Sequence, residues 1–535
     1  MSKSTQGDEC IETRNPPSSS MRKWRFWAVF PGLCFSSFLT AFDASVVFTA
    51  LPTMVADLQS GQTYIWIINA YTLAMCAVQP LYGQAADIFG RKATHIAAIV
   101  LFLIGSCICG LAKRTAVLVV GRTIQGVGGG GLSIMPSMII SDLVPLRERQ
   151  KYTGIIYGTF AIGTFIGPVL GGVLTNTIGW RWIFFLVMII AGLTLLFTIL
   201  FLRVKYERQG TVLQRLLRID FVGNTALIPS VTAILLALTN SSGTYSWTSY
   251  HVLLPLLLGL LGLAGFLYLQ SNTCLRFAEP TVPLRLFLNL ASFIAFMMTL
   301  LHGLLLYWTS LYLPVYFQAI RQDTPQISGV SCLASAIPLV PAGVFGGILI
   351  AKYGKYKLNQ ICGFILMAVG LGLFSLLDSN SQIAEWIMFQ FIFAVGAGLV
   401  LTALLPAIQA PLSDDDTAAA TATWGFVQAF GFIWGAAIPS AIFNHRVSSL
   451  SNHVNDLRVR SILQGGGAYE HASKAFLSSL DAKLRNDVVE IFTSGIKFTW
   501  QISIAFSGCG LILALIIPSV RLRKDLNTNF GLDER

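Results

Sequence analysis

The chain has 535 residues, of which 54% are hydrophobic and 11% are charged. Ordinary soluble domains carry about a quarter charged residues, so this composition excludes a typical water-soluble fold. The net charge is +11, but lysine and arginine are dispersed through short connections. This dispersal argues against a nucleic-acid-binding surface and favours membrane orientation as the reason for the excess.

Apolar runs of roughly 20 residues, enough for a helix to cross a bilayer, recur along the chain. The first run continues past the length of a removable signal peptide and has no small-residue cleavage site, which predicts a retained helix. The sequence therefore predicts an all-α polytopic membrane protein with fourteen spans, held by the lipid bilayer. Their approximate ranges are 27–50, 64–86, 93–112, 115–141, 152–175, 182–202, 219–239, 251–270, 290–317, 328–351, 358–377, 385–406, 416–443 and 497–520.

An even number of spans places both termini on one side of the membrane. Basic residues are concentrated in the connections on that side, whereas the short loops on the other side hold only Lys113, Arg114, Arg181 and Arg321. The positive-inside rule then predicts that both termini are cytoplasmic. The sequon at Asn240 falls outside, where it predicts glycosylation.

Several classes of site are absent from the sequence. Most of the nine cysteines lie inside apolar runs without metal-ligand spacing, so we expect no disulfide framework, metal site or cofactor. The Gly-x4-Gly-Lys-Ser/Thr motif for ATP does not occur. Gly126, Gly128 and Gly131 match a dinucleotide pattern, but they lie inside a predicted span with no strand before them.

Asp43 lies two-thirds along the first span and is the clearest intramembrane carboxylate. Burial disfavours the charged form of a carboxylate and a nearby cation favours it, so such a group can bind and release a proton. Asp43 is therefore a candidate for proton coupling. The alternative is a carboxylate permanently bonded to backbone or hydroxyl groups.

A charged turn joins the second and third spans. Arg91 and Lys92 follow the orientation rule, and Gly83 and Gly90 allow helices to approach closely. Asp87 is costly near hydrocarbon and needs a partner. We interpret this turn as a charge lock at a mobile seam, against the plainer reading of an ordinary cytoplasmic turn.

Arg122 lies near the outer end of the fourth span, where an arginine needs a polar cavity, a partner, or a path to the interface. In the fifth span, Gly163, Gly167 and Gly171 recur every four residues and form one smooth face, and Pro168 favours a kink. A rocking seam and static small-residue packing both fit this pattern.

The last external connection, 444–496, contains a repeat of apolar residues every four positions, which predicts an amphipathic helix. Its members are Phe476, Leu480, Leu484, Val488 and Phe492. This helix either lies on the outer membrane surface or packs on its own protein.

A cavity for a large amphipathic substrate requires aromatic side chains and a few polar groups. Candidates by residue type and depth are Trp66, Asn69, Gln79, His302, Trp308, Trp424, Gln428 and Trp434.

Several motifs resemble signatures of one transporter family. Gly83-x3-Asp87-x2-Gly90-Arg91-Lys92 resembles the loop signature of the major facilitator superfamily. Arg122-x-x-Gln125-Gly126 and the run from Gly163 to Gly172 are similar to its span-four and antiporter signatures. Asp43-Ala44-Ser45-Val46-Val47 and the run Tyr312–Gln318 resemble the fourteen-helix drug:proton antiporters, particularly fungal toxin-efflux members.

This resemblance implies two six-helix bundles, 27–204 and 276–520, with linker and two inserted helices in 205–275 and cytoplasmic tails at 1–26 and 521–535. It implies that the loop acts as a latch, that Arg122 takes part in coupling, and that the glycines up to Gly172 form an antiporter helix. The substrate site would lie near the midplane.

The expected function is proton-coupled export of small amphipathic organic compounds such as drugs, toxins or secondary metabolites, with protons and a small molecule as partners. The plasma membrane is the expected location, with the vacuolar membrane as the alternative. A rival function is transport of a siderophore or other metal chelate, and a remoter one is a non-transporting receptor or enzyme. The sequence contains no HExxH motif or nucleophile elbow that favours an enzyme.

Overall fold

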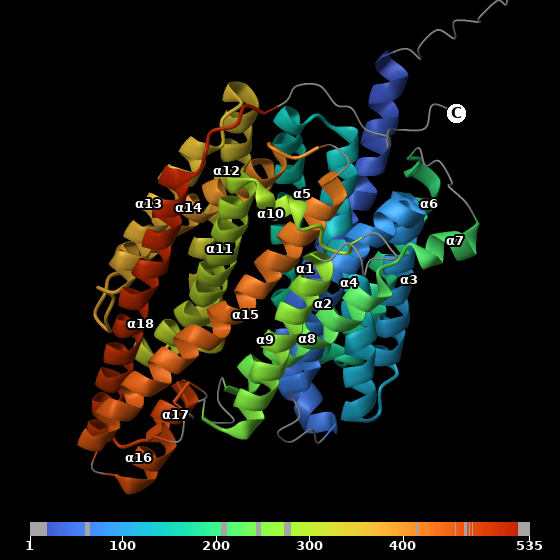
Figure 1. The fold of residues 1–535 in the computed structure, drawn as a ribbon. Helices are drawn as coiled ribbons and strands as arrows, with labels where there is room; N and C mark the ends of the chain where they lie inside the picture. The colour runs from blue at the N-terminus through green and yellow to red at the C-terminus, as the bar shows by residue number, and fades with distance from the viewer. Residues whose placement is uncertain are drawn as a thin grey trace, which may run out of the picture.

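We describe the fold from a computed structural model (Figure 1). It describes residues 19–58, 65–204, 211–241, 248–271, 280–413, 416–454, 456–464, 468–469, 471–472 and 474–522. Among these residues, twelve helices are long and apolar enough to cross a membrane. The expectation of an all-α polytopic membrane protein is therefore confirmed. Most of both predicted tails lies outside the described residues.

Each of the fourteen predicted spans corresponds to a long helix. The first six are α1 (Ser19–Leu58), α2 (Ile65–Phe89), α3 (Arg91–Gly110), α4 (Thr115–Leu143), α5 (Leu146–Thr177) and α6 (Arg181–Phe201). The next two are α8 (Phe221–Ser241) and α9 (Tyr250–Ser271). The last six are α11 (Leu290–Val315), α12 (Pro325–Tyr353), α13 (Lys357–Phe374), α14 (Ile383–Gln409), α15 (Thr417–Leu450) and α18 (Ala482–Ile516).

Two of these helices, α2 and α4, do not reach the apolarity of the other twelve. Both contain buried polar side chains, such as Gln79 in α2 and Arg122 in α4. Polar groups inside a membrane are expensive and are retained where they find partners. Fourteen crossings thus remain a prediction that rests on these two helices.

The last six long helices repeat the packing of the first six. In the first half, α1 packs on α5, α3 packs on α4 and α6, and α2 packs on α4. The equivalent pairs in the second half are α11 with α15, α13 with α14 and α18, and α12 with α14. The inserted helices α8 and α9 pack on each other, and α8 also packs on α2 and α15 (Figure 1).

A lysine caps the last helix of each half in the same way. Lys92, at the start of α3, donates its Nζ proton to the Ile199 carbonyl near the end of α6 at 2.8 Å. Lys357, at the start of α13, donates to the carbonyls of Leu515 and Ile517 at the end of α18. A cation at a helix C-terminus satisfies carbonyls that have no partner within the helix. The repeat therefore extends to single contacts.

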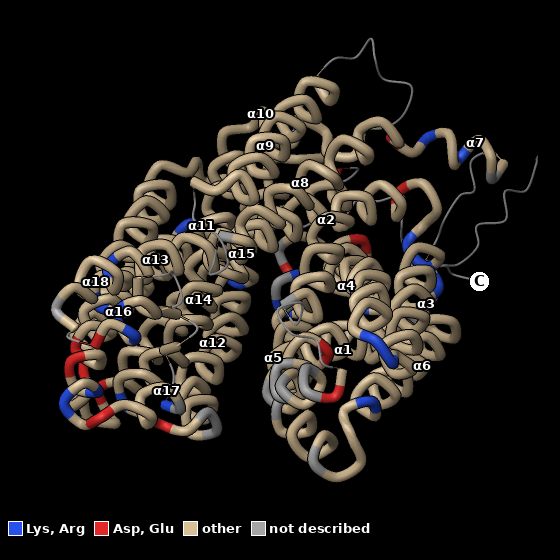
Figure 2. The backbone as a smooth tube through the Cα atoms, turned by 90° about the horizontal axis from the view of Figure 1, so that it is seen from below, with Lys and Arg blue, Asp and Glu red and all other residues tan. Residues whose placement is uncertain are grey.

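The molecule has two ends along the helix axes. The start of α1 and the end of α18 lie at one end, together with the turn between α2 and α3, and we call this the α2–α3 end (Figure 1). The short helices α16 (Leu457–Gln464) and α17 (Lys474–Ser478) lie at the opposite, α16–α17 end. Viewed from that end, charged residues are sparse along the long helices and frequent around α16 and α18 (Figure 2).

The predicted amphipathic helix of the connection 444–496 is not a separate element. Its first residue, Phe476, lies in α17, whereas Leu484, Val488 and Phe492 belong to α18, which begins at residue 482. Val488 and Phe492 are fully buried in the hydrophobic core of the second half. The apolar face therefore packs on its own protein, because that half supplies enough apolar surface to cover it.

The two halves meet at the α2–α3 end, mainly through α5 with α12 and α2 with α15. Gly154 of α5 faces Val344 of α12, and Gly83 of α2 faces Ala422 of α15. Both pairs lie within about three turns of the α2–α3 ends of their helices. This end of the molecule is held closed in the present conformation.

Candidate functional site: a buried carboxylate and guanidinium

Asp43 lies deep inside the first half and is 0% exposed. Its Oδ2 accepts a hydrogen bond from Arg122 Nη1 at 2.7 Å, and its Oδ1 accepts one from Gln125 Nε2 at 2.7 Å. Both donors belong to α4, where a spacing of three residues puts them on one helix face. The partners are thus side chains of another helix, in contrast to the alternative of backbone or hydroxyl partners.

Arg122 is held by several contacts. Its Nη1 also donates to Gln125 Oε1 at 2.7 Å, and its Nε donates to the Ile67 carbonyl at 3.1 Å. The guanidinium lies 4.3 Å from the centre of the Tyr71 ring, a cation–π geometry. Because the residue is 1% exposed, it does not extend to the membrane surface as a snorkelling arginine does.

Two glycines allow the helices to approach closely enough for this hydrogen-bond network to form. A Cβ atom on Gly105 of α3 would lie 2.6 Å from the Cα atom of Gln125, and one on Gly126 of α4 would lie 2.9 Å from the Cα atom of Tyr71. These distances are too short for any side chain, so α2 and α3 reach α4 only because these positions are glycine. The approach also lets Gln125 donate to Ser106 Oγ at 2.9 Å.

A buried ion pair of this kind is sensitive to proton transfer. Removal of one partner of a buried pair costs about 3–5 kcal/mol, because the other charge stays desolvated and unpaired. A proton added to Asp43 would have the same effect on Arg122, which would then need a new partner or access to water. Protonation of Asp43 would therefore weaken the contact between α1 and α4.

The predicted charge lock joins three helices of the first half. Arg91 donates to Asp87 Oδ1 at 2.6 Å and to Asp142 Oδ2 of α4 at 2.6 Å, and Arg91 itself is 2% exposed. These bonds do not cross to the second half. The seam contact is made by Gly83, where a Cβ atom would lie 2.6 Å from that of Ala422 in α15. Gly90 adopts φ 88°, a conformation that favours glycine.

The predicted antiporter helix packs on α1 along its glycine face. A Cβ atom on Gly163 would lie 2.6 Å from the Phe38 carbonyl oxygen, and one on Gly167 would lie 3.0 Å from the Val46 nitrogen. Gly171 is buried, whereas a Cβ atom on Gly172 would meet open space. The helix continues through Pro168. The glycine face of α5 thus packs against α1, the helix that carries Asp43.

The predicted substrate residues fall into different surroundings. Gln79 donates to Ser133 Oγ at 3.1 Å, and His302 is fully buried with its Nε2 3.0 Å from the Ala397 carbonyl. Trp308 is also fully buried, and its ring packs near that of Phe506 in α18. The remaining candidates, Trp66, Asn69, Trp424, Gln428 and Trp434, are half-buried or buried. Their roles as substrate contacts stay predictions.

Asn240 lies at the end of α8 and is half-buried. Its side-chain amide, the group that would carry a glycan, donates to the His251 carbonyl at 3.4 Å. Ser242 of the sequon lies outside the described residues. Glycosylation stays a prediction.

Some members of the network were not singled out from the sequence. Gln125 was part of the quoted signature, and its position three residues after Arg122 is the signal that could have identified it. Tyr71, Asp142 and the Ile67 carbonyl carry no such signal, because only the fold brings them to their partners.

In the part of the chain that the structure describes, no group of three or more His, Cys, Asp or Glu residues could hold a metal ion.

Comparison with known proteins identifies the class. Residues 33–436 match the profile of the Major Facilitator Superfamily, and the chain belongs to this family. It is therefore a multi-pass membrane transporter and not an enzyme. Solved structures agree in fold: the proton:xylose symporter XylE superimposes with a TM-score of 0.57 at 15% identity, over 94% of this chain and 98% of that one.

Several fungal transporters are similar to the chain in sequence. The chain is 44% identical to the efflux pump FUS6 of Gibberella moniliformis, over 98% of this chain and 94% of that protein. It is 44% identical to the MFS-type efflux pump LUC4 of a Fusarium species, over 97% and 93%. It is 42% identical to the acurin A biosynthesis cluster MFS-type transporter of Aspergillus aculeatus, over 97% and 93%. The expected similarity to fungal efflux transporters is confirmed.

Proposed function

We propose that this transporter exports small amphipathic organic compounds in exchange for protons, by alternating access. The observation that carries the proposal is the fully buried pair of Asp43 and Arg122, whose atoms lie 2.7 Å apart. Charged groups are rarely retained inside membrane helices without a function. A carboxylate whose one cationic partner sits on another helix is suited to couple a proton to helix movement.

In this mechanism the ionised Asp43 holds α4 against α1. A proton that arrives from the acidic side neutralises the carboxylate and releases Arg122, so the two helices repack. The contacts between the halves at the α2–α3 end then open while those at the opposite end close. Release of the proton on the other side restores the pair and the present conformation.

The basic residues of the connections support an orientation with the α2–α3 end and both termini in the cytoplasm. The plasma membrane is the proposed location, and the vacuolar membrane is the alternative. Export from the cytoplasm fits the names of the relatives described above, two of which are efflux pumps and one a transporter of a biosynthesis cluster. A metal chelate such as a siderophore is the second candidate cargo.

The test is transport by the purified full chain in sealed vesicles with an imposed pH gradient. Labelled apolar metabolites and a ferric chelate would be offered separately. We expect gradient-driven movement of an apolar compound by the wild-type chain and its loss in Asp43→Asn, because the amide cannot exchange a proton.

The matched control is Asp57→Asn, a carboxylate on the same helix that lies outside the apolar span. We expect this variant to keep gradient-driven transport. Full coupling in Asp43→Asn, with the control also active, would remove Asp43 from the mechanism. Movement of only the ferric chelate would replace the proposed cargo.

A further inference from the structure

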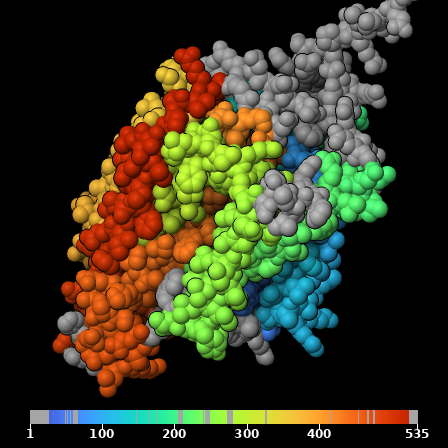
Figure 3. All heavy atoms as spheres, viewed as in Figure 1, coloured from blue at the N-terminus to red at the C-terminus, as the bar shows by residue number. Residues whose placement is uncertain are grey.

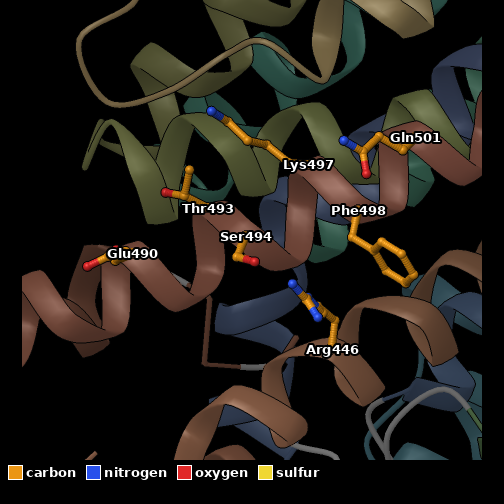
Figure 4. Close-up of a pocket in the computed structure, with 7 residues that line it drawn as sticks. All are labelled: Arg446, Glu490, Thr493, Ser494, Lys497, Phe498 and Gln501. Carbon is orange, nitrogen blue, oxygen red and sulfur yellow. The ribbon is translucent and has the colours of Figure 1, made fainter. Parts of the chain in front are cut away.

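A polar cavity lies between α15 and α18, away from the Asp43 network. It measures about 350 Å³, near the lower limit of small-molecule sites, roughly 300–1,000 Å³. Arg446 of α15 and Lys497 of α18 supply two cations, and Glu490 of α18 supplies one carboxylate (Figure 4). Hydroxyl groups of Thr493 and Ser494 complete its polar wall. The cavity can therefore receive a group that carries both charges.

The position of the cavity along α18 places it at the edge of the membrane. This helix has 35 residues and ends at Ile516. A span of roughly 20 residues counted back from Ile516 begins near Lys497. Arg446 lies four residues before the end of α15, at the same α16–α17 end of the molecule. The cavity thus lies at the depth of the lipid headgroups.

The same face of α18 is apolar below the cavity. Ala505, Ile512 and Ile516 recur near helical spacing, and all of them are exposed. An exposed apolar stripe on a membrane helix faces acyl chains, because the buried face of α18 is directed at its own bundle. Figure 3 shows α18 at the outer face of the second half. The cavity is therefore continuous with a lipid-facing surface.

The polar side chains along α18 occur in the same order as the chemical groups that would bind them in a phospholipid. Above the apolar stripe comes Gln501, whose amide can donate to a glycerol ester carbonyl. One turn further out lies Lys497, and two more turns out lies Glu490, about 10 Å from Lys497 along the axis. A phosphate belongs next to the cations and an ammonium group next to the outermost carboxylate. Acyl chain, ester, phosphate and amine occur in this sequence in phosphatidylethanolamine.

Arg446 has donor capacity for such a ligand. Its guanidinium carbon lies 5.5 Å from the centre of the Phe498 ring, which orients the side chain beside the cavity. Its Nε atom is buried and has no hydrogen-bond partner among the described residues. A buried donor without a partner costs free energy unless a ligand or water accepts its proton. A lipid phosphate would satisfy it.

We propose that this cavity binds the headgroup of a zwitterionic aminophospholipid from the leaflet at the α16–α17 end. The phosphate lies against the Arg446 guanidinium, and the Lys497 side chain, which extends away from Arg446 in Figure 4, turns towards it. The ammonium group lies against Glu490. The bound lipid fastens the long outer part of α18 to α15, the pair that closes this side of the second half.

The experiment is native mass spectrometry of the delipidated full chain in detergent, with one additive at a time. The additives are phosphatidylethanolamine, phosphatidylglycerol, diacylglycerol and inorganic phosphate. We expect one retained phosphatidylethanolamine, weaker retention of phosphatidylglycerol and no retention of diacylglycerol. Because a hydrogen bond to a charged group contributes about 1.5–3 kcal/mol, Arg446→Gln should weaken binding of the first lipid at least about tenfold.

Matched variants make the result specific. Lys483→Gln removes an exposed cation of α18 that does not line the cavity, and we expect wild-type binding. Lys497→Gln, a half-buried position, repeats the test if Arg446→Gln does not fold. Glu490→Gln should lower binding of phosphatidylethanolamine to the level of phosphatidylglycerol and leave the latter unchanged.

Three results would overturn the proposal. Equal lipid binding in wild type, Arg446→Gln and Lys497→Gln would remove the site. Equal retention of diacylglycerol would show binding through the acyl chains alone. Displacement of the lipid by millimolar inorganic phosphate would assign the cavity to a soluble anion. No transported compound enters this assay, so its outcome is independent of the transport experiment.

Discussion

Asp43 and Arg122 are each satisfied by partners that lie on different elements. Asp43 receives both of its hydrogen bonds from α4, whereas Arg122 also donates to a backbone carbonyl at the start of α2. A small displacement between α1 and α4 would therefore break the charged bonds and leave the bond to α2 intact. In the proposed mechanism, Arg122 would therefore keep its bond to α2 while it changes its partner on α1.

Replacement of Arg122 by lysine tests the geometry apart from the charge. A lysine keeps the positive charge but lacks the planar fork that reaches Asp43, Gln125 and the Ile67 carbonyl together. We expect Arg122→Lys to lose most pH-gradient-driven transport, and Arg122→Ala to lose it entirely. The measurement is initial transport rate against external pH. A lysine variant with the wild-type pH profile would mean that charge alone suffices.

Asp57 provides a pH test outside the apolar span. A hydrogen bond from Trp180 Nε1, and a second from Arg181, lower the pKa of the Asp57 carboxyl below its ordinary value of 3.8. A lowered folded-state pKa stabilises the fold above the unfolded pKa, and this contribution is lost as pH falls through the folded value. The wild type should thus unfold at higher temperature than Asp57→Ala at pH 7.

The difference in unfolding temperature between the two chains should shrink as the pH falls below about 4. Thermal unfolding of both purified proteins at pH 7, 5 and 3 measures it. A difference that stays constant over this range would show that ionisation of Asp57 does not contribute.

Among the elements, glycine decides where helices of the two halves meet. Gly83 lets α2 lie directly on α15, because the space that its side chain would occupy is filled by Ala422. The charge lock of Arg91 acts differently, since it joins α2, α3 and α4 within one half. The lock thus joins helices of one half, while the glycine contact is the surface that separates in the proposed mechanism.

Gly83→Ala should therefore slow turnover. The added Cβ would lie 2.6 Å from the Cβ atom of Ala422, so closure at the α2–α3 end requires a backbone shift. We expect a lower maximal transport rate with similar substrate affinity. Gly192→Ala in α6 is the control, because its Cβ would meet open space. Equal rates in the two variants would contradict a role of this contact in closure.

At the scale of the molecule, one buried arginine bridges the halves. Arg149 of α5 donates to Gln409 Oε1 of α14, and also to the Ser141 carbonyl of α4 at 2.5 Å. Gln409 in turn donates to Thr421 of α15 at 2.9 Å. The bridge lies at the α2–α3 end, and Arg149 itself is 2% exposed. It must break whenever this end opens.

Arg149→Gln should shift the chain towards conformations open at this end. A bond to a charged group contributes about 1.5–3 kcal/mol, so the open population should rise about tenfold. Spin labels at Lys151 and Lys352, in a chain with its native cysteines replaced, report the separation of α5 and α12. Arg203→Gln, an exposed cation at the same end, is the control and should leave the distance distribution unchanged.

The helices and their order could be predicted because a bilayer admits few structures. Apolar runs of span length must become helices, and the position of basic residues orients them. Asp43, Arg122 and the turn from Gly83 to Lys92 were singled out as candidates from the sequence. Polar groups inside an apolar run are costly unless they have a partner or a function. The apolar repeat at 476–492 packs on its own protein, one of the two predicted alternatives, but it is divided between α17 and α18. Periodicity does not reveal where one helix ends and the next begins.

The sequence by itself determined the class of protein, the approximate spans and the rare charged positions, because hydrophobicity and charge are properties of single residues. Only the tertiary structure decided that Asp43 pairs with Arg122 and Gln125, that Arg91 joins Asp142, and that Arg446 borders a cavity with Lys497. Each of these partners lies on another helix, many residues away in the chain. Helix packing, set by where glycines permit close approach, brings them within bonding distance.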